Sequence, residues 1–351
     1  MGNDIYINGR FLSQPMTGIP RFGYELCRAL LAAGVDFTVV VPADILPAYD
    51  LPFKTIQYGK LKSHLWEQID LFLFLKSRHN PLLISFSGLG PVFYKNHIAT
   101  IHDLVFIRHP QWFSKMYCLI YKILTPIVVR NAKKIITVSN ASKQEIITLL
   151  KTNPDKITVV YNALSDTFLH QSPPKPDQSS GEKYILALSS INPRKNFLRI
   201  IRAFRELNMP GMKLYVAGAT SGVFNPENAC NQIITDDVRI LGHLNDRELS
   251  DYYRHAQLLI FPSLHEGFGV PPLEAQANGC PVVVSDIPAL KEIYGDSVAY
   301  CNPCDVSSIV SQMKNVLEDE ALRNDLIRKG YKKTHQYSWT KSAQKVVDCV
   351  M

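Results

Sequence analysis

Short apolar runs alternate with amphipathic stretches along the first half of the chain. The apolar runs are rich in β-branched residues, which favour buried strands, and the stretches between them repeat apolar positions at helical spacing. The predicted strands are 4–8, 37–42, 82–86, 97–102, 135–139 and 157–161, and the clearest predicted helices are 21–33 and 141–151. This alternation predicts βαβ units and a mostly parallel, buried sheet.

The same alternation restarts after a segment without hydrophobic periodicity. Residues 170–181 hold three prolines, three serines and one glycine, a composition typical of a linker. Beyond it the predicted strands are 184–189, 213–217, 238–241, 258–261, 282–285 and 298–300, and the predicted helices are 198–207, 246–256 and the segment after about 305. The pattern therefore predicts an α/β fold with two Rossmann-like parallel-sheet domains.

These elements also predict where the domains begin and end. The first domain covers 1–168, the linker 169–182, the second domain 183–335, and a final helix lies in 336–351. Two open α/β domains joined by a linker are expected to face a cleft. Ligands of such sheets bind outside the carboxyl ends of the strands, so we expect the chemistry in loops that follow strands.

Composition and charge exclude several classes of protein. The chain has 351 residues, of which 46% are hydrophobic and 20% charged, as in folded domains. The net charge of +7 arises in the first half, because residues 1–170 hold 18 basic and 11 acidic residues, whereas residues 171–351 hold 20 of each. Any anionic surface is therefore expected to meet the first half. The charge is modest and no recognition motif is visible, so no nucleic-acid partner is expected.

The sequence also predicts a cellular compartment. The opening residues lack the basic-then-apolar pattern of a secretory signal. The most apolar stretch, 116–129, contains Lys122 and Pro126 and is too short to span a bilayer. Seven cysteines are scattered along the chain, and the one close pair, Cys301 and Cys304, lacks the second pair that a zinc ribbon needs. We expect a cytoplasmic protein with reduced thiols and no bound metal.

Two polar motifs follow predicted strands of the first domain. Gly18 opens a helix soon after the first strand, where a helix N-terminus favours an anion, although an ordinary strand-to-helix turn would look the same. His102 and Asp103 end another strand, where they can orient hydroxyl groups or handle protons. The alternative is a histidine that is bonded to local backbone and an aspartate that caps a turn.

A pair of cations follows the first strand of the second domain. Arg194 and Lys195 come after the strand at 184–189 and before a helix, whose N-terminus adds partial positive charge. The planar fork of arginine and the point charge of lysine suit a diphosphate. A solvated surface pair is the alternative.

The most informative motif follows the strand at 258–261. Glu266 precedes a Gly-Phe-Gly loop, and Glu274 lies about one turn into the next helix, which Pro271 and Pro272 begin. The glycines allow backbone amides to face a ligand. Two carboxylates with backbone donors between them suit a polyhydroxylated ligand. A carboxylate near a helix N-terminus is also favourable by itself, which is the alternative for Glu274 but leaves Glu266 unexplained.

Together these motifs resemble the family-4 glycosyltransferases of GT-B fold. The resemblance runs in order over nearly the whole chain, and its most specific part is the Glu-x7-Glu element formed by Glu266 and Glu274. Its other parts are the opening strand with the loop 17–19, His102 with Asp103, the segment 138–143, Arg194 with Lys195, and the segments 241–244 and 281–286. Two positions depart from the family pattern, because Pro20 and Asn196 stand where glycine is frequent in the family.

The resemblance implies a retaining, metal-independent transfer of a hexose from a nucleotide-diphosphate sugar to a hydroxyl group. Arg194 and Lys195 would hold the diphosphate. Glu274 would bond the ribose, Glu266 the hexose, and His102 would meet the donor sugar at the reacting face, so that the cations, Glu266 and His102 form the catalytic set. The remaining donor contacts that the resemblance implies are Gly18, Asp103, Leu244, Gly267, Phe268, Gly269 and Val270. No cofactor beyond the donor itself is implied.

The resemblance also assigns roles to the domains. The first would bind the acceptor and the second the nucleotide sugar, and the C-terminal helix would cross back to the first domain. The stretch 110–134 combines aromatic residues with lysines and arginine around an apolar face, which suits an anionic membrane surface. A core-facing helix with a solvated basic side is the alternative. On the membrane interpretation, the acceptor is a lipid-linked saccharide at the inner face of the cytoplasmic membrane.

The sequence leaves the donor and two other functions open. GDP-mannose and a UDP- or dTDP-hexose all fit, in the assembly of a surface polysaccharide or of the O-antigen of lipopolysaccharide. A nucleotide-sugar 2-epimerase would use a similar two-domain cleft, but it needs acid–base carboxylates in both domains and fits the Gly-Phe-Gly loop less well. A non-catalytic nucleotide-sugar binder is the other alternative, and the intact set of His102, Glu266 and Glu274 argues against it.

Overall fold

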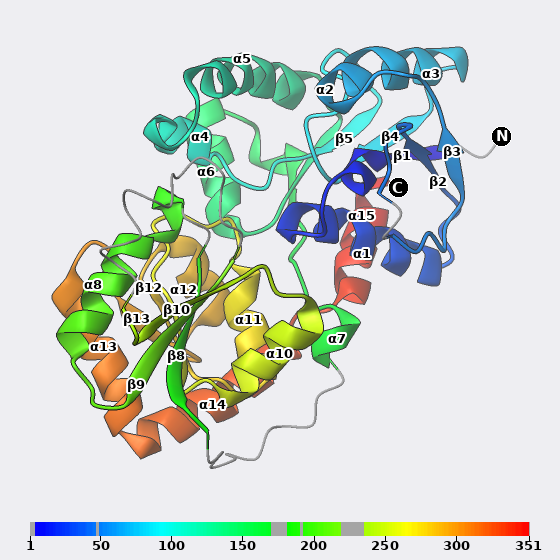
Figure 1. Ribbon diagram of the computed structural model, residues 1–351. Coiled ribbons are helices and arrows are strands. Elements are labelled where there is room, and N and C mark those ends of the chain that lie inside the picture. Colours follow the sequence, from blue (N-terminus) through cyan, green and yellow to red (C-terminus); the bar gives the residue numbers. More distant parts are fainter. Residues whose placement is uncertain (1–3, 47–48, 170–180, 190–191, 219–234, 351) are drawn as a thin grey trace. The chain divides into compact units, whose positions relative to one another are not determined.

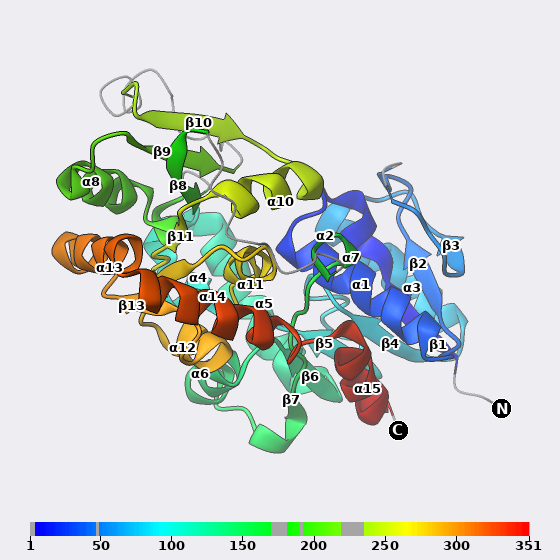
Figure 2. The same cartoon turned by 90° about the horizontal axis from the view of Figure 1, so that it is seen from below.

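The chain folds into two compact units, each with its own parallel sheet. The computed structural model describes residues 4–46, 49–169, 181–189, 192–218 and 235–350. Unit 1 comprises residues 1–162 and 338–351, and unit 2 comprises residues 163–337. Figure 1 shows the two sheets, and Figure 2 shows the helices that cover them. The predicted α/β fold with two Rossmann-like domains is confirmed.

Unit 1 contains a seven-stranded parallel sheet in the order β3-β2-β1-β4-β5-β6-β7 among the described residues. Its strands are β1 (Ile5–Asn8), β2 (Thr38–Val41), β3 (Thr55–Gln57), β4 (Leu82–Ser85), β5 (His97–Thr100), β6 (Lys134–Thr137) and β7 (Ile157–Val159). Its helical segments are η1 (Gly9–Ser13), α1 (Gly18–Ala32), α2 (Ser63–Leu65), η2 (Trp66–Leu71), α3 (Phe72–Ser77), α4 (Val105–Arg108), η3 (Pro110–Trp112), α5 (Lys115–Asn131), α6 (Asn140–Leu150), η4 (Pro154–Lys156) and α15 (Trp339–Val350). Strand β3 escaped the sequence analysis because it is a short edge strand that is only partly buried.

Unit 2 contains a six-stranded parallel sheet in the order β10-β9-β8-β11-β12-β13 in the part of the chain that is described. Its strands are β8 (Lys183–Leu188), β9 (Met212–Ala217), β10 (Val238–Gly242), β11 (Leu258–Phe261), β12 (Val282–Ser285) and β13 (Ala299–Cys301). Its helical segments are α7 (Asp166–Leu169), η5 (Pro193–Lys195), α8 (Phe197–Leu207), α10 (Asp246–His255), α11 (Val270–Ala277), α12 (Pro288–Tyr294), α13 (Val306–Glu318) and α14 (Glu320–Thr334). Strands β11 and β12 are buried throughout, as the central strands of a sheet covered on both faces must be.

The boundary between the units lies earlier than the sequence indicated. We expected the first domain to extend to residue 168, but residues 163–168 belong to unit 2. The reason is helix α7, which packs on α10 and α11 and buries Phe168 with its ring 6.3 Å from that of Tyr253. Most of the predicted linker, residues 170–180, lies outside the described residues.

The C-terminal boundary also shifts, by two residues. Unit 2 runs to Tyr337 rather than to 335, because the Tyr337 hydroxyl donates to the carbonyl of Ile293 at 2.9 Å. Helix α15 packs against α1 in unit 1, where Trp339 contacts Phe22 and the Ser342 hydroxyl donates to the carbonyl of Tyr161 at 2.7 Å. The final helix is therefore part of the fold of unit 1, although it follows unit 2 in sequence.

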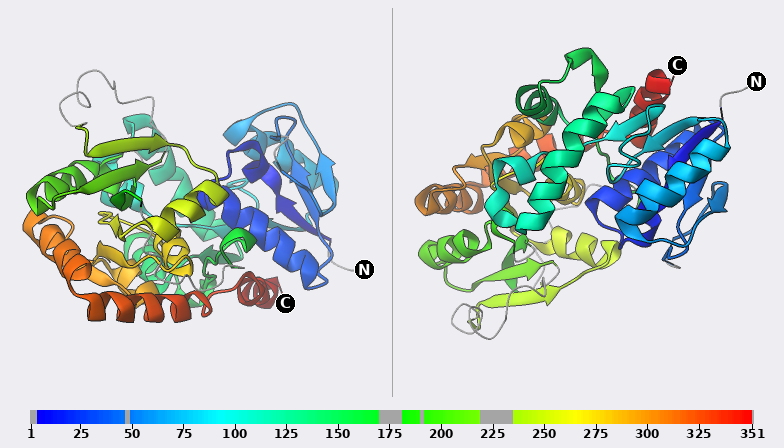
Figure 3. Two further views of the ribbon diagram at one scale, coloured as in Figure 1. Left: turned by 60° about the horizontal axis from the view of Figure 1, so that its bottom comes forward. Right: turned by 90° about the horizontal axis from the view of Figure 1, so that it is seen from above.

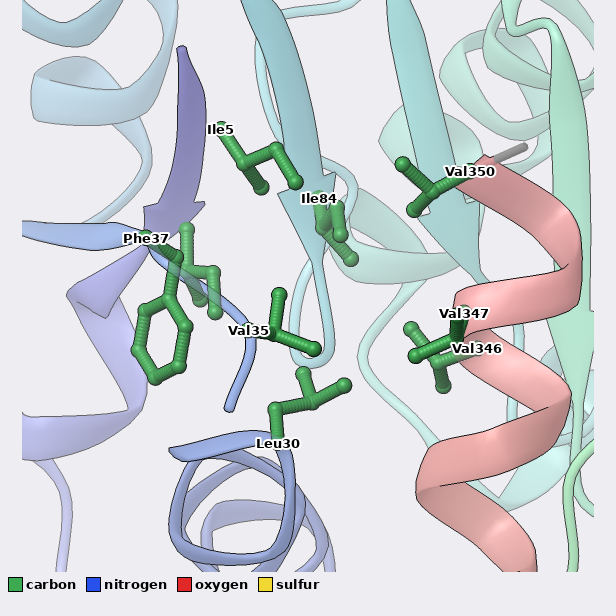
Figure 4. A pocket seen from close by; sticks show the side chains of 9 residues that line it. Ile5, Leu30, Val35, Phe37, Ile84, Val346, Val347 and Val350 are labelled. Carbon is green, nitrogen blue, oxygen red and sulfur yellow. The ribbon is translucent and has the colours of Figure 1, made fainter. Parts of the chain in front are cut away.

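A cavity of about 200 Å³ lies between α15, α1 and the sheet of unit 1. Figure 4 shows Leu30 from α1, Ile84 from β4 and the valines of α15 around it. Its lining is entirely apolar, comprising Ile5, Ile7, Leu30, Val35, Phe37, Ile84, Val346, Val347 and Val350. Apolar cavities of this kind stay dry, so this space marks imperfect packing under α15 and offers no polar contact to a substrate.

A network of buried polar side chains lies at the carboxyl edge of the sheet in unit 1. Glu67 is fully buried on the π-helical segment η2, where it accepts from the side-chain nitrogen of Asn8 at 2.8 Å and pairs with Arg10 at 3.1 Å. The Ser85 hydroxyl also accepts from Asn8, and it lies 2.9 Å from Nε2 of His97. A buried charge that is paired and hydrogen-bonded in this way fixes one arrangement of the loops that follow β1 and β4.

We expect His97 to make unit 1 sensitive to acid. Burial lowers the pKa of His97 from 6.5 to about 3, so the folded chain keeps the ring neutral where the unfolded chain protonates it. Its contribution to stability is complete above pH 6.5 and is lost as the pH falls from 6.5 towards 3, at ~1.4 kcal/mol per pH unit. Urea unfolding between pH 7 and 4 should therefore show a steeper loss of stability for the wild type than for His97→Gln. Equal pH slopes for the two proteins would contradict this assignment.

Candidate active site

The two cations that follow β8 are held in a fixed turn. The side chain of Asn192 accepts from the backbone nitrogen of Arg194 at 2.9 Å and so begins the short helix η5. The carbonyl of Arg194 accepts from the backbone nitrogen of Leu264 at 2.8 Å, which ties this turn to the loop after β11. Strands β8 and β11 are neighbours in the sheet, so the cation motif and the glutamate motif meet at one carboxyl edge.

Lys195 and Glu266 form a short ion pair at this edge. Lys195 Nζ lies 2.6 Å from Glu266 Oε1, and the two side chains are 17% and 8% exposed. Lys195 Nζ also sits 4.6 Å from the centroid of the Phe261 ring, a favourable position for a cation. Lys195 is therefore not the solvated surface cation that the alternative interpretation required.

The charge of Glu266 depends on its cationic neighbours. Burial alone would raise the pKa of Glu266, but the positive charges of Lys195 and Arg194 outweigh this effect and hold the pKa below its usual value. Glu266 is therefore a carboxylate at neutral pH. An ionised carboxylate accepts hydrogen bonds and does not donate a proton, so this residue suits the binding of hydroxyl groups.

Asn196 explains one departure from the family pattern. Its φ is +61°, in the left-handed region where glycine is favoured and asparagine is tolerated. Its side-chain nitrogen donates to the carbonyls of Pro262 at 3.0 Å and Pro303 at 2.6 Å, and the residue is 4% exposed. Asparagine thus adopts the backbone conformation that glycine would supply and adds two bonds to neighbouring loops.

Replacing Asn196 by alanine should destabilise unit 2 by about 2–4 kcal/mol, because two buried carbonyls lose a donor and alanine is strained at a positive φ. Asn196→Gly should cost less, since glycine keeps the backbone conformation and loses only the bonds. Urea or thermal unfolding measures both changes. Equal costs for the two variants would show that the left-handed conformation contributes nothing.

The Gly-Phe-Gly loop is closely packed against its neighbours. Gly269 has a φ of +81°, and a Cβ there would lie 2.6 Å from Leu290 Cδ2. Its carbonyl accepts from the hydroxyl of the fully buried Tyr294. Phe268 is 3% exposed and meets the Tyr337 ring edge-on at 5.5 Å, so its side chain belongs to the core. Gly267, Phe268 and Gly269 are all buried.

Glu274 is the fifth residue of α11 and is 8% exposed. Its Oε2 accepts from the hydroxyl of Tyr253 at 3.2 Å. Burial, together with the charge of Glu274, raises the pKa of Tyr253 well above its usual value, so the hydroxyl keeps its proton and donates. Tyr253 is not among the residues predicted from the sequence. The signal that could have identified it is its place on the buried face of the amphipathic helix 246–256.

Two further predicted donor contacts, Val270 and Leu244, lie at or just before the start of a helix. Val270 is the first residue of α11 and is partly buried. Leu244 lies between β10 and α10, where Asn245 and Glu248 form a capping box that fixes the start of α10. The segment 219–234, which precedes β10, lies outside the described residues.

Three predicted site residues belong to unit 1, and the most informative of them is His102. Its Nε2 lies 2.9 Å from the carbonyl of Phe86, and its ring meets that of Phe22 edge-on at 5.0 Å. A carbonyl only accepts, so Nε2 carries the hydrogen and the neutral ring has its lone pair on Nδ1. Burial lowers the pKa of His102, although the Phe86 carbonyl and Asp103 partly oppose this effect. His102 is thus a neutral hydrogen-bond acceptor near pH 7.

Asp103 and Gly18 are placed as turn residues. Asp103 Oδ1 accepts from the backbone nitrogen of Val105 at 3.2 Å, at the start of α4, as the turn-capping alternative required. Gly18 is the first residue of α1, is exposed, and would bring an added Cβ within 4 Å of nothing. Neighbouring protein atoms therefore do not require a glycine here.

The described ranges contain no group of three or more histidine, cysteine or acidic residues that could hold a metal ion. Within the same ranges, every helix is too short or too polar to cross a membrane. Cys301 is buried and Cys304 is exposed, and both are free thiols.

Two family models cover most of the chain. The model described as Glycosyltransferase Family 4 matches residues 16–168, and the model described as Glycosyl transferases group 1 matches residues 169–333. The two parallel-sheet units and the glutamate motif define a GT-B glycosyltransferase. The chain belongs to glycosyltransferase family 4, so the predicted family and the predicted enzyme class are confirmed.

Curated relatives and solved structures agree with this assignment. The O-antigen chain mannosyltransferase B of Escherichia coli is 27% identical over 361 residues, covering 93% of this chain and 94% of that protein. The O-antigen chain mannosyltransferase RfbU of Salmonella typhimurium is 31% identical over 224 residues, covering 63% of this chain and 61% of that protein.

Three solved structures share the fold over 99% of this chain. Sucrose-phosphate synthase from Thermosynechococcus elongatus has a TM-score of 0.79 at 17% identity and is covered over 97% of its length. WaaG, a glycosyltransferase involved in lipopolysaccharide biosynthesis, has a TM-score of 0.76 at 16% identity, with 99% covered. HepE from Anabaena, in complex with UDP and glucose, has a TM-score of 0.73 at 16% identity, with 99% covered.

Proposed function

We propose that this glycosyltransferase moves a hexose, with mannose as the first candidate, from a nucleotide-diphosphate sugar to a hydroxyl of a lipid-linked saccharide in the assembly of a surface polysaccharide such as the O-antigen. The observation that carries the donor assignment is the pairing of Lys195 with Glu266 at 2.6 Å, beside Arg194, at the carboxyl edge of β8 and β11. The choice of mannose and of O-antigen draws on the names of the two curated relatives.

The cations and carboxylates of unit 2 suit both the diphosphate and the hydroxyl groups of such a donor. Fixed cations stabilise the charge that develops on a departing diphosphate, and they can replace the divalent cation that other transferases use. Glu266 and Glu274 are acceptors for hydroxyl groups, and the loop between them supplies backbone donors. HepE, which shares the fold, is described in complex with UDP and glucose, which supports a donor of this class.

Retention of configuration is the stereochemical outcome we propose. The acceptor oxygen forms its bond to the anomeric carbon on the face from which the diphosphate leaves, and the proton of the acceptor passes to the leaving phosphate. The carboxylate of Glu266 is engaged by Lys195, which favours a binding role over a nucleophilic one. His102 accepts a hydrogen bond from a sugar hydroxyl through its Nδ1.

We assign the acceptor to unit 1 and place the enzyme at the inner face of the cytoplasmic membrane. The basic stretch 110–134 contains α5, which buries Cys118, Thr125, Val128 and Val129 and exposes the opposite side. One face of the helix packs on the core, as the core-facing alternative required, and the exposed opposite face supports the proposed contact with an anionic surface.

An assay of donor consumption with a panel of acceptors tests the proposal. The purified protein is incubated with GDP-mannose, UDP-hexoses or dTDP-hexoses, with saccharide acceptors, in the presence and absence of EDTA. Transfer of the hexose with an α-linkage from an α-donor, unaffected by EDTA, is the expected result. Interconversion of donors without an acceptor would identify an epimerase. Donor binding without turnover across the acceptor panel would identify a non-catalytic binder.

A further inference from the structure

Unit 1 exposes a set of large apolar side chains on three segments. The exposed fractions are 62% for Leu65, 45% for Ile69, 52% for Leu73, 72% for Phe93, 65% for Met116, 55% for Leu119, 42% for Ile120 and 54% for Ile123. The first three are spaced by four residues along α2, η2 and α3 and so share one helix face. The opposite face of the same helical stretch is buried through Trp66 and Phe74. Large apolar side chains that are exposed together, rather than scattered singly, mark an interaction site.

The three segments are neighbours in the fold. The Tyr121 hydroxyl on α5 lies 3.2 Å from Nε2 of His64 on α2. The side chain of Gln68 on η2 donates to the carbonyl of Gly90 at 2.7 Å, and that of Asn131 at the end of α5 donates to the carbonyl of Val92 at 3.1 Å. The loop that carries Phe93 thus lies between the two helical stretches. Both stretches are on the side of unit 1 that faces the viewer in the right-hand view of Figure 3.

The exposed charges around these side chains are basic. They are Lys60, Lys62, Lys76 and Arg78 beside α2 and α3, and Lys115, Lys122, Arg130 and Lys133 on or beside α5. Acidic residues are fewer than basic ones in the same segments. Glu67 is fully buried, Asp70 accepts from the backbone nitrogens of Lys60 and Leu61, and residues 110–134 contain no aspartate or glutamate.

We propose that α2, η2, α3, the loop 90–94 and α5 form one lipid-binding surface that inserts its apolar side chains into an anionic bilayer. The proposal rests on the membrane contact proposed above for residues 110–134, and it adds residues 63–77 and Phe93, which the sequence did not single out. Apolar side chains bordered by lysine and arginine suit the boundary between head groups and acyl chains. A second copy of the chain is disfavoured, because a two-fold contact would set these basic borders against each other.

Flotation with lipid vesicles tests this surface without donor or acceptor. The wild-type protein should float with vesicles of phosphatidylcholine and phosphatidylglycerol, and part of it should stay bound at ~1 M salt, where charges are screened beyond ~3 Å. The double variant Ile69→Glu with Leu73→Glu should bind at least ~10-fold less at low and high salt, because each glutamate replaces an inserted side chain. The matched control is Leu198→Glu on α8 of unit 2, where the leucine is 55% exposed, and it should float like the wild type.

Three results would overturn the proposal. The double variant could float as well as the wild type, or the wild type could fail to float. Light scattering could also show a wild-type dimer that the double variant dissociates, which would assign the surface to a second copy. An unchanged melting temperature and an unchanged stabilisation by nucleotide sugar show that the variant is folded. Transfer to a water-soluble saccharide would persist if only the lipid surface were wrong, so the two proposals fail separately.

Discussion

Lys195→Ala should lower kcat/KM for sugar transfer by about 10²–10³, the usual cost of removing one fixed group that stabilises developing charge. The lysine lies beyond the carboxyl end of β8, with its Nζ 2.6 Å from Oε1 of Glu266. In the proposed mechanism it neutralises the charge of the departing diphosphate. Its loss also leaves Glu266 buried with one cation fewer, which raises the pKa of that carboxyl and weakens its hold on the hexose. Both effects act in the same direction on the rate.

The matched control is Lys213→Ala. Lys213 also forms a 2.6 Å pair, with Glu182 in the same unit, but these side chains are 32% and 43% exposed. Exposed pairs contribute little, and this one lies at the other end of the strands, so activity should stay within about twofold. The melting temperature of each variant separates loss of chemistry from loss of fold. Near-wild-type kcat/KM in a folded Lys195→Ala protein would refute a role for the lysine at the diphosphate.

Glu274→Gln should weaken the binding of nucleotide sugar by about 10- to 100-fold, because hydrogen bonds to a charged acceptor contribute about 1.5–3 kcal/mol. The carboxylate already accepts from the Tyr253 hydroxyl and, in our assignment, completes its bonding with the hydroxyls of the ribose. An amide offers one neutral acceptor oxygen in place of two charged ones, so its hydrogen bonds to the hydroxyls are weaker. The rise in melting temperature with added ligand reports the change.

Comparison of two ligands makes this experiment specific. Glu274→Gln should reduce stabilisation by the nucleoside diphosphate and by the complete nucleotide sugar, whereas Glu266→Gln should reduce only the additional effect of the hexose. Glu318→Gln, an exposed position on α13, serves as the neutral control. Stabilisation by the nucleoside diphosphate that is unchanged in Glu274→Gln would remove the ribose assignment.

The hydrophobic pattern predicted the fold well because buried parallel strands have a local signature. Strands such as β11 and β12 are continuous apolar runs, and the sequence located them within a residue. The edge strand β3 has no such run, and it was missed. Residues 163–168 pack with unit 2 rather than with unit 1, because the packing of Phe168 on Tyr253 joins positions far apart in sequence.

The sequence predicted which residues belong to the site, but it did not predict which residues they contact. Gly269 was identified from the motif, and its positive φ beside Leu290 gives the physical reason for glycine there. Asn196 departs from the family pattern, in which glycine is frequent at this position. The structure shows that its backbone keeps a left-handed conformation and that its side chain donates hydrogen bonds to two carbonyls. The network of Arg10 with Glu67 was not predicted, because a buried ion pair has no periodic signature.

The sequence by itself determined the two α/β domains, the family, and the positions of the cations and carboxylates, since each of these depends on residues that are close together along the chain. Only the tertiary structure decided that Lys195 meets Glu266 across 71 residues, that Tyr253 bonds Glu274, and that Leu65, Ile69 and Leu73 remain exposed beside α5. Such contacts and exposures depend on which strand ends and helix faces become neighbours after folding. A linear pattern carries the chemistry of each side chain but not the distance between two of them.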